Sequence, residues 1–282
     1  MKKNDLFEQR VSADGRLRYV HAVTDRAMPD ESFESHTHDT ELEIYRFREG
    51  KLSFFFEGRR LRISDGTMLA IVDGRMHRPI LTAACRYERE RILLSREAIL
   101  SAGGEEFYRA LARRGLLRLT PEGARAIGAD ARFAAIAAAI ATPDGDASFR
   151  ALSHTLALFS AMYEESIGED DPEITYPEGT VGEILRYADA HLSEDLSYGA
   201  VSSRFYLSEK ALYKLLRREV GFTLSEYVRA RRILSAKEQL RLGRAATEVA
   251  LSLGYCDYTV FYRAFLAETG RSPSQYAAEN RL

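Results

Sequence analysis

The pattern of apolar and polar positions in the last hundred residues predicts one helical motif that occurs twice. Each copy has a short apolar helix, a tight break, a small capping residue and a longer helix with one apolar stripe. The copies span residues 201–216 and 249–265. Apolar residues that recur three and four positions apart mark the buried face of an amphipathic helix. We therefore predict an all-α region that contains two helix-turn-helix motifs.

The longer helix of the first copy begins after Ser208, whose hydroxyl can accept a hydrogen bond from a free backbone N–H. Its apolar stripe consists of Ala211, Leu212, Leu215 and Leu216. Helices of this kind place their first turns in the major groove of DNA and their later basic residues against phosphates. The opposite face, a candidate DNA-binding surface, carries Glu209, Lys210, Tyr213, Lys214, Arg217 and Arg218.

The second copy repeats this plan, with Asp257 as the capping residue and a helix predicted over residues 258–269. A helix over residues 224–242 joins the copies, and it opens at a capping box formed by Thr223 and Glu226. The alternative interpretation is a helical bundle with a solvated charged face. One motif would leave that alternative open, but two copies with matching caps favour DNA binding.

The first half of the chain has the short, alternating runs that are typical of strands. Turn signals such as Glu49-Gly50 and Asp65-Gly66 separate these runs. Regularly spaced short strands favour a β-sandwich or a β-barrel. The predicted strands cover residues 18–23, 32–38, 43–48, 51–57, 60–64, 67–72 and 86–94.

Residues 96–168 are richer in alanine and favour helices. The last of these helices, over residues 148–167, carries an apolar seam of Phe149, Leu152, Leu156, Phe159 and Tyr163. Spacings of three and four residues are typical of helices that pair with each other. The seam predicts either a dimer contact or packing against the chain's own strands. The acidic, Pro- and Gly-containing residues 169–179 are predicted to be an interdomain linker.

The 282-residue chain has a formal net charge of −2, but this charge is unevenly distributed. Residues 180–282 hold 15 Lys and Arg against 12 Asp and Glu, which leaves about +3 there and about −5 in the remainder. This fits a DNA-binding module joined to another domain and excludes a protein that coats nucleic acid along its whole length. The two cysteines, Cys85 and Cys256, predict neither a disulfide framework nor a cysteine zinc site. With no secretory or membrane-spanning segment apparent, we expect a cytoplasmic protein.

The C-terminal region, about residues 180–280, resembles the AraC family of bacterial transcription regulators. The resemblance includes the stretches Gly221-Phe222-Thr223…Tyr227-Val228, Glu248-Val249-Ala250…Gly254-Tyr255…Asp257 and Gly270…Ser272-Pro273…Tyr276. It implies that both recognition helices enter successive major-groove turns on one face of DNA. The base-reading candidates by position are Lys210, Tyr213 and Lys214 in the first copy and Tyr258, Thr259, Tyr262 and Arg263 in the second. Tyr206 departs from the family because it stands where the family usually has a turn glycine, so this turn must either take a positive φ at Tyr206 or adopt another shape.

The strand region resembles the cupin barrel in two short motifs. The first has the spacing His-x-His-x4-Glu-x6-Gly, and the second has much of a Gly-x7-Gly-x2-His pattern. In cupins these side chains can bind a metal such as iron, manganese, nickel, copper or zinc. They can equally line a pocket for an organic effector or form a satisfied polar interior. The residues concerned are His36, His38, Glu43 and His77.

Together these patterns predict an α+β multidomain protein, with a cupin-like β-barrel and a helical extension followed by an all-α double helix-turn-helix region. The predicted divisions are the ligand-binding barrel over residues 1–95, a helical support and dimerisation region over 96–168, the linker over 169–179 and the DNA-binding domain over 180–282. The predicted function is a sequence-specific transcription regulator, not an enzyme, controlled by a small-molecule effector for which a sugar is one candidate.

The expected partners are double-stranded promoter DNA, the effector, a second copy of the chain in a homodimer and RNA polymerase, with no membrane. No cofactor is required, although the histidine site is a candidate for a divalent metal. Two other functions stay open. A metal-dependent cupin enzyme with an accessory DNA-binding domain requires bound metal and turnover. A constitutive DNA binder whose barrel only dimerises predicts no ligand-dependent change in affinity.

Overall fold

The computed structural model describes residues 5–29, 40–142, 144–166, 171 and 174–280 of the chain. The strand predicted over residues 32–38 and the candidate ligands His36 and His38 lie outside these residues. The chain divides into two compact units. The N-terminal unit comprises Met1–Phe54 and Leu61–Ile174, and the C-terminal unit comprises Phe55–Arg60 and Thr175–Leu282.

The strands form two sheets. The larger sheet is antiparallel throughout, in the order β1 (Leu6–Val11), β2 (Leu17–Ala27), β8 (Cys85–Ser95), β3 (Glu41–Glu49), β6 (Met68–Ile71) and β9 (Leu116–Leu119). The smaller sheet has the order β10 (Ile174–Thr175), β5 (Arg59–Arg62), β4 (Leu52–Phe56) and β7 (His77–Leu81). The strands that the structure describes therefore make a sheet-rich fold without closing into one continuous barrel.

Six of the seven predicted strands lie within the described residues, and each overlaps an observed strand. The strands β1, β7, β9 and β10 were not predicted. β7 contains Pro79, which cannot donate to a sheet and argues against a strand in a sequence pattern. β1 lies at the edge of the described sheet, where it pairs with β2. Its neighbouring residues Leu6 and Phe7 are both exposed. It therefore lacks the alternation that marks a half-buried strand.

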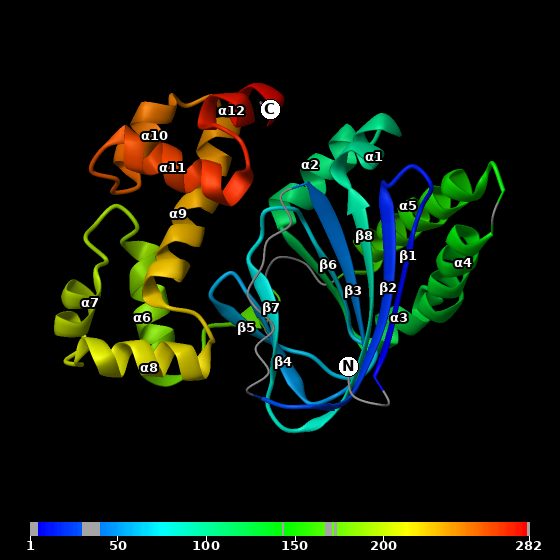
Figure 1. Cartoon of the computed structure of the whole chain (residues 1–282), viewed down its shortest axis with the longest axis horizontal. Helices are drawn as coiled ribbons and strands as arrows, with labels where there is room; N and C mark the ends of the chain where they lie inside the picture. Colours follow the sequence, from blue (N-terminus) through cyan, green and yellow to red (C-terminus); the bar gives the residue numbers. More distant parts are fainter. Residues whose placement is uncertain (1–4, 30–39, 143, 167–170, 172–173, 281–282) are drawn as a thin grey trace. The chain divides into compact units, whose positions relative to one another are not determined.

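One face of the six-stranded sheet lies under a layer of helices (Figure 1). The register places Tyr19, Ile92, Ile44, Ala70 and Leu117 side by side across five strands, and all five are buried. Because side chains alternate along a strand, this face forms one continuous apolar core. The helices that contribute to it are α1 (Arg96–Ser101), α2 (Glu105–Arg114), α3 (Pro121–Ala126), α4 (Ala129–Ala141) and α5 (Ala147–Glu165).

The apolar seam of α5 packs against the chain's own sheet and helices. Phe159 is buried in this core, and Leu152, Leu156 and Tyr163 are partly buried against it. Only Phe149, at 72% exposure, points into solvent. Of the two interpretations of the seam, self-packing is therefore the one that the structure shows within this unit.

The predicted linker begins with a buried contact. Asp171 accepts hydrogen bonds from two nitrogens of Arg118 on β9, one of them Nη2 at 2.7 Å from Oδ1. Both side chains are at most 9% exposed. A paired guanidinium and carboxylate out of solvent form a rigid attachment. This end of the linker is consequently fixed to the N-terminal unit.

The C-terminal unit is otherwise helical, and its long helix α9 runs between two groups of shorter helices (Figure 1). The first group packs on one part of α9 and the second group on the other. The helices are α6 (Gly179–Ala190), α7 (Tyr198–Arg204), α8 (Glu209–Glu219), α9 (Leu224–Arg241), α10 (Ala246–Ser252), α11 (Tyr258–Thr269) and α12 (Pro273–Asn280). We call α7 and α8 the first motif and α10 and α11 the second motif.

Local capping signals mark where the helices of this unit begin and end. Thr223 and Glu226 form a complete capping box at the start of α9. Gly270 ends α11 in the left-handed conformation, and Gly221 after α8 has a φ of 74°. These local signals act within a few residues, so the sequence alone carries them.

Three basic residues of α9 do not point freely into solvent. Lys237 is 5% exposed, and its ammonium lies 6.0 Å from the centre of the Tyr276 ring. Arg231 donates hydrogen bonds of 2.8 Å to Asp189 and to Glu57 within the same unit. Arg232 donates to backbone carbonyls. Long basic side chains can pack their stems inward and still find acceptors.

Within the described part of the chain, no helix combines the length and the apolar character needed to cross a membrane.

Candidate DNA-binding interface

The helix α8 presents its predicted face to solvent. The hydroxyl of Ser208 accepts from the backbone N–H of Ala211 at 3.2 Å, which fixes the start of the helix. Leu212 and Leu216 are fully buried, and this fixes its rotation. The five candidate DNA contacts of this helix are accordingly exposed: Lys210, Tyr213, Lys214, Arg217 and Arg218.

The charges on α8 differ in how they are engaged. Arg217 donates to Glu226 and to the carbonyl of Gly221, each at 3.1 Å, and Arg218 pairs with Glu219 at 2.9 Å. Exposed ion pairs such as these contribute only about 0–1 kcal/mol, so a phosphate can replace the carboxylate. Lys210 and Lys214 have no ion-pair partner among the residues described. The helix therefore offers two uncommitted ammonium groups beside two exchangeable guanidinium groups.

The helix α11 repeats this geometry in the second motif. The carboxylate of Asp257 accepts from the backbone N–H of Val260 at 3.0 Å. This hydrogen bond lowers the pKa of Asp257 below its usual value, so the cap is ionised at neutral pH. Phe261 and Phe265 are fully buried and fix the rotation of the helix. Of the four candidates, Thr259 and Arg263 are exposed, whereas Tyr258 and Tyr262 are half-buried.

Val260 is an exposed residue of this surface that the sequence pattern did not single out. Its side chain is 44% exposed in the first turn of α11, next to Thr259. Apolar side chains are ordinarily assigned to the core. The missed signal was its position, one residue away from the buried stripe of Phe261 and Phe265.

The two motifs differ in their tight turns. Tyr206 has a φ of 55° and Gly254, at the equivalent place in the second motif, has a φ of 75°. Of the two shapes expected for this turn, a positive φ at Tyr206 is the one that the structure shows. Glycine adopts this conformation without a Cβ clash, whereas other residues are strained there. The first turn thus keeps a strained residue, which is 95% exposed and contributes little packing.

Replacing Tyr206 with glycine should relieve this strain. We expect Tyr206→Gly to be more stable than Tyr206→Ala by about 1 kcal/mol, because the two variants differ only in the Cβ that is strained at positive φ. Urea unfolding followed by circular dichroism measures the difference. A Tyr206→Ala variant as stable as Tyr206→Gly would show that the turn is not strained.

The candidate effector residues that the structure describes meet on the other face of the six-stranded sheet. His77 Nε2 lies 2.9 Å from Glu43 Oε2, and each residue is 2% exposed. The ring of Phe54 stacks on the imidazole, with centroids 5.9 Å apart. The structure therefore brings together two of the four predicted residues, and His36 and His38 lie outside the described residues.

The imidazole of His77 is engaged at both nitrogens. Its Nδ1 donates to the carbonyl of Arg75 at 2.8 Å, and its Nε2 faces Glu43. A metal-ligating histidine ordinarily donates its other ring N–H to a backbone carbonyl or a carboxylate, so the Nδ1 bond is compatible with a ligand at Nε2. The residues that the structure describes contain no group of three or more His, Cys, Asp or Glu side chains placed to hold a metal ion.

A model of a helix-turn-helix domain matches residues 201–279, which include both motifs. The regulatory protein SoxS of Salmonella typhimurium is 33% identical over 94 residues, which are 33% of this chain and 88% of SoxS. The chain belongs to the AraC family.

Two further similarities cover different lengths of the chain. The transcriptional activator RhaS of Escherichia fergusonii is 27% identical over 121 residues, or 43% of this chain and 42% of RhaS. Among solved structures, apo ToxT of Vibrio cholerae is 12% identical with a TM-score of 0.37, covering 93% of this chain and 97% of ToxT.

Family membership makes this chain a DNA-binding transcription regulator and confirms the prediction that it is not an enzyme. The interpretation as a metal-dependent cupin enzyme is set aside for the same reason. The helix-turn-helix model lies entirely in the C-terminal unit. What the N-terminal unit does must therefore be argued from its own residues.

Proposed function

We propose that this AraC-family protein reads promoter DNA with both α8 and α11, and that a small molecule bound in its N-terminal unit controls this binding. The DNA-reading part rests on one observation. A helix with a capped start, one buried face and an exposed basic and aromatic face occurs twice in the C-terminal unit. In the first motif Lys210, Tyr213 and Lys214 contact bases. Arg217 and Arg218 contact phosphates. In the second motif the base-reading residues are Tyr258, Thr259, Tyr262 and Arg263.

The length of α9 supports contacts in two successive turns of the major groove. α9 has 18 residues. At about 1.5 Å per residue it is about 27 Å long. Successive major-groove turns on one face of DNA are about 34 Å apart. A helix of this length with one motif at each end can place two recognition helices near that separation. Val260 adds an exposed apolar group suited to a thymine methyl.

Selection from a pool of random duplexes tests the DNA-reading part of the proposal. The full chain should enrich sequences with two conserved blocks whose centres lie about 10 base pairs apart, because each recognition helix reads one block. The same selection without protein controls for amplification bias. Enrichment of a single block, or no enrichment, would contradict the proposal that both helices read bases.

The observations that support an effector are buried polar groups on the face of the large sheet opposite the helices. Glu43 and Tyr45 of β3 lie there, and Arg91 Nη1 is 3.6 Å from Glu43 Oε1. The hydroxyls of Tyr45 and Tyr87 form a hydrogen bond inside the same unit. These groups pair with one another, and a few convergent polar side chains among apolar ones are typical of a ligand pocket. Hydroxyl-rich molecules such as sugars suit this set of donors and acceptors.

Replacing Glu43 with glutamine should abolish the response to the effector. A sugar or metabolite that binds the wild-type chain at about 100 times its Kd should raise the melting temperature by about 5–10 °C. In Glu43→Gln we expect this shift to disappear while DNA binding without effector persists. Differential scanning fluorimetry over a metabolite panel measures the shift.

The pair His21–Glu88 supplies a matched control. Its atoms are 3.0 Å apart on the opposite face of the same sheet. Glu88→Gln should therefore keep the full shift. If Glu43→Gln keeps it as well, the effector does not bind at Glu43 and His77.

A further inference from the structure

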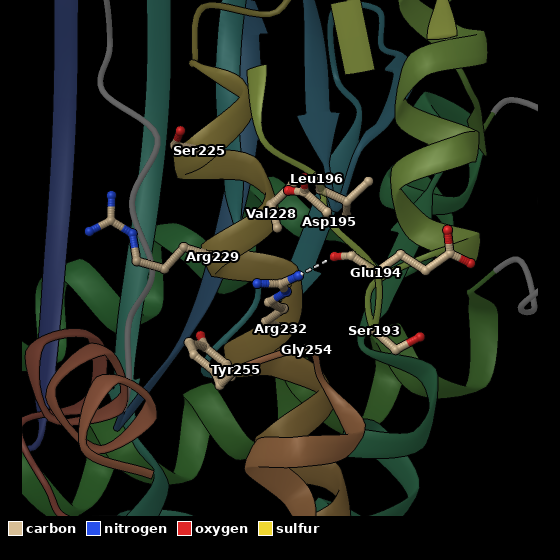
Figure 2. A pocket seen from close by; sticks show the side chains of 10 residues that line it. All are labelled: Ser193, Glu194, Asp195, Leu196, Ser225, Val228, Arg229, Arg232, Gly254 and Tyr255. Carbon is tan, nitrogen blue, oxygen red and sulfur yellow. Dashed lines mark hydrogen bonds between the residues drawn. The ribbon is translucent and has the colours of Figure 1, made fainter. Parts of the chain in front are cut away.

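Arg232 joins the first motif to the helix α9. Its Nε donates to the carbonyl of Leu192 at 2.9 Å, and its Nη2 donates to the carbonyl of Glu194 at 2.8 Å. Figure 2 shows the second of these bonds as a dashed line. Both carbonyls belong to the loop between α6 and α7, which leads directly into the first motif. The planar guanidinium thus binds the backbone of this loop through two hydrogen bonds.

The same guanidinium also faces the second motif. It lies 5.4 Å from the centre of the Tyr255 ring, in the turn between α10 and α11. The Tyr255 ring in turn packs edge-on against Phe261, with centroids 5.3 Å apart. Phe261 lies in the core that holds α9, α10, α11 and α12 together. A continuous chain of contacts therefore runs from the α6–α7 loop through Arg232 into the second motif.

Gly254 shows how closely the two motifs approach at this point. A Cβ at Gly254 would lie 2.6 Å from the carbonyl oxygen of Ser193 and 2.9 Å from Arg232 Nη2. Beside this approach, a cavity of about 420 Å³ is bounded by the loop, α9 and the turn (Figure 2). The loop and the turn therefore approach each other beside a hollow, and Arg232 lies where they meet.

We propose that Arg232 is a positioning residue that fixes the spacing and angle between α8 and α11, and thereby the number of base pairs between the two half-sites of the operator. The inference rests on the proposed function, in which both helices read bases. Inserting one base pair moves the second half-site by about 3.4 Å and rotates it by about 34°. Hydrogen bonds fail when the donor and acceptor separate beyond about 3.5 Å. To reach a second half-site displaced by one base pair, α11 must move relative to α8. The Arg232 hydrogen bonds oppose this movement.

The test compares two DNA probes that differ in one base pair. The first is a duplex selected from a random pool by the wild-type full chain, and the second has one base pair inserted between its two blocks. A third duplex with only the first block measures the first motif alone. Fluorescence anisotropy gives the affinity for each probe.

For the wild-type chain we expect the insertion to lower affinity about tenfold or more, equivalent to 1.4 kcal/mol. For Arg232→Met, which keeps the length of the side chain but has no donors, we expect a loss of less than about threefold. Affinity for the single-block duplex should be unchanged, because each motif is intact. A tenfold loss that persists in Arg232→Met would overturn the proposal. Weaker binding to the single-block duplex together with an unchanged spacing preference would also overturn the proposal. That result would indicate a general structural role for Arg232.

Arg229 provides the matched control on the same helix. It pairs with Glu268 at 3.5 Å and makes no contact with the α6–α7 loop carbonyls that hold Arg232. Arg229→Met should behave as the wild type, and a loss of spacing preference there would overturn the proposal. If Arg232→Met is unfolded by circular dichroism, Arg232→Lys replaces it, and full spacing preference in that folded variant would overturn the proposal. If no duplex is enriched in the selection, the proposed function fails instead.

Discussion

Replacing Lys210, Tyr213 and Lys214 together with alanine is expected to lower affinity for the selected duplex by about a hundredfold or more. Each contact with a base edge contributes about 1–3 kcal/mol, and 1.4 kcal/mol corresponds to a factor of ten. The three side chains are exposed and lie on the face opposite the buried Leu212 and Leu216. The variant should therefore remain folded.

The measurement is a titration of labelled duplex at fixed ionic strength, with a scrambled duplex as reference. Binding to the scrambled duplex should fall much less than binding to the selected one. A contrasting variant, Arg217→Ala with Arg218→Ala, should weaken both duplexes alike and reduce the salt dependence by about two charges. Unchanged affinity in the triple variant would show that these three residues of α8 do not contact DNA.

Replacing Asp171 with alanine is expected to lower the free energy of unfolding of the N-terminal unit by about 3–5 kcal/mol. Arg118 and Asp171 are both buried, and removal of the carboxylate leaves a guanidinium without its counter-charge. This loss is large because a buried unpaired charge cannot be solvated by water. Urea unfolding followed by far-ultraviolet circular dichroism measures it.

The pair Asp144–Arg150 is the control for this experiment. Its atoms are 2.6 Å apart, but its side chains are 45% and 39% exposed. Asp144→Ala should therefore change stability by only about 0–1 kcal/mol. If Asp171→Ala is as stable as Asp144→Ala, the start of the linker is not anchored by Arg118.

The C-terminal unit was predictable because its signals are local. Ser208, Thr223 and Asp257 each cap a helix through an N–H three residues further along. The apolar stripes follow from a period of 3.6 residues. Both kinds of information lie within one helix, so the sequence alone predicts the start of α8 and both ends of α11.

Contacts that join distant residues were not predictable in the same way. Arg118 and Asp171 are 53 residues apart, and Arg232 reaches carbonyls about 40 residues earlier in the chain. Nothing in the local pattern distinguishes Arg232, which is held by the loop, from Arg229, which is exposed. Such pairs form only once the helices and strands have packed.

The structure of the N-terminal unit was predictable only in part. Alternation predicted most strands, but β7 was missed because of Pro79 and β1 because both of its first residues are exposed. The cupin-like spacing correctly placed Glu43 next to His77, 34 residues away. Its implication of a metal also rests on His36 and His38, which lie outside the described residues.

Guanine methylation interference on the selected duplex tests most directly the central claim that two helices read the major groove. Methylation at guanine N7 blocks contacts in the major groove only. We expect two clusters of interfering guanines about 10 base pairs apart on one face of the DNA. The alanine variant of Lys210, Tyr213 and Lys214 should erase one cluster, and a Tyr262→Ala, Arg263→Ala variant should erase the other. A single cluster, or two clusters that both survive these substitutions, would contradict the claim.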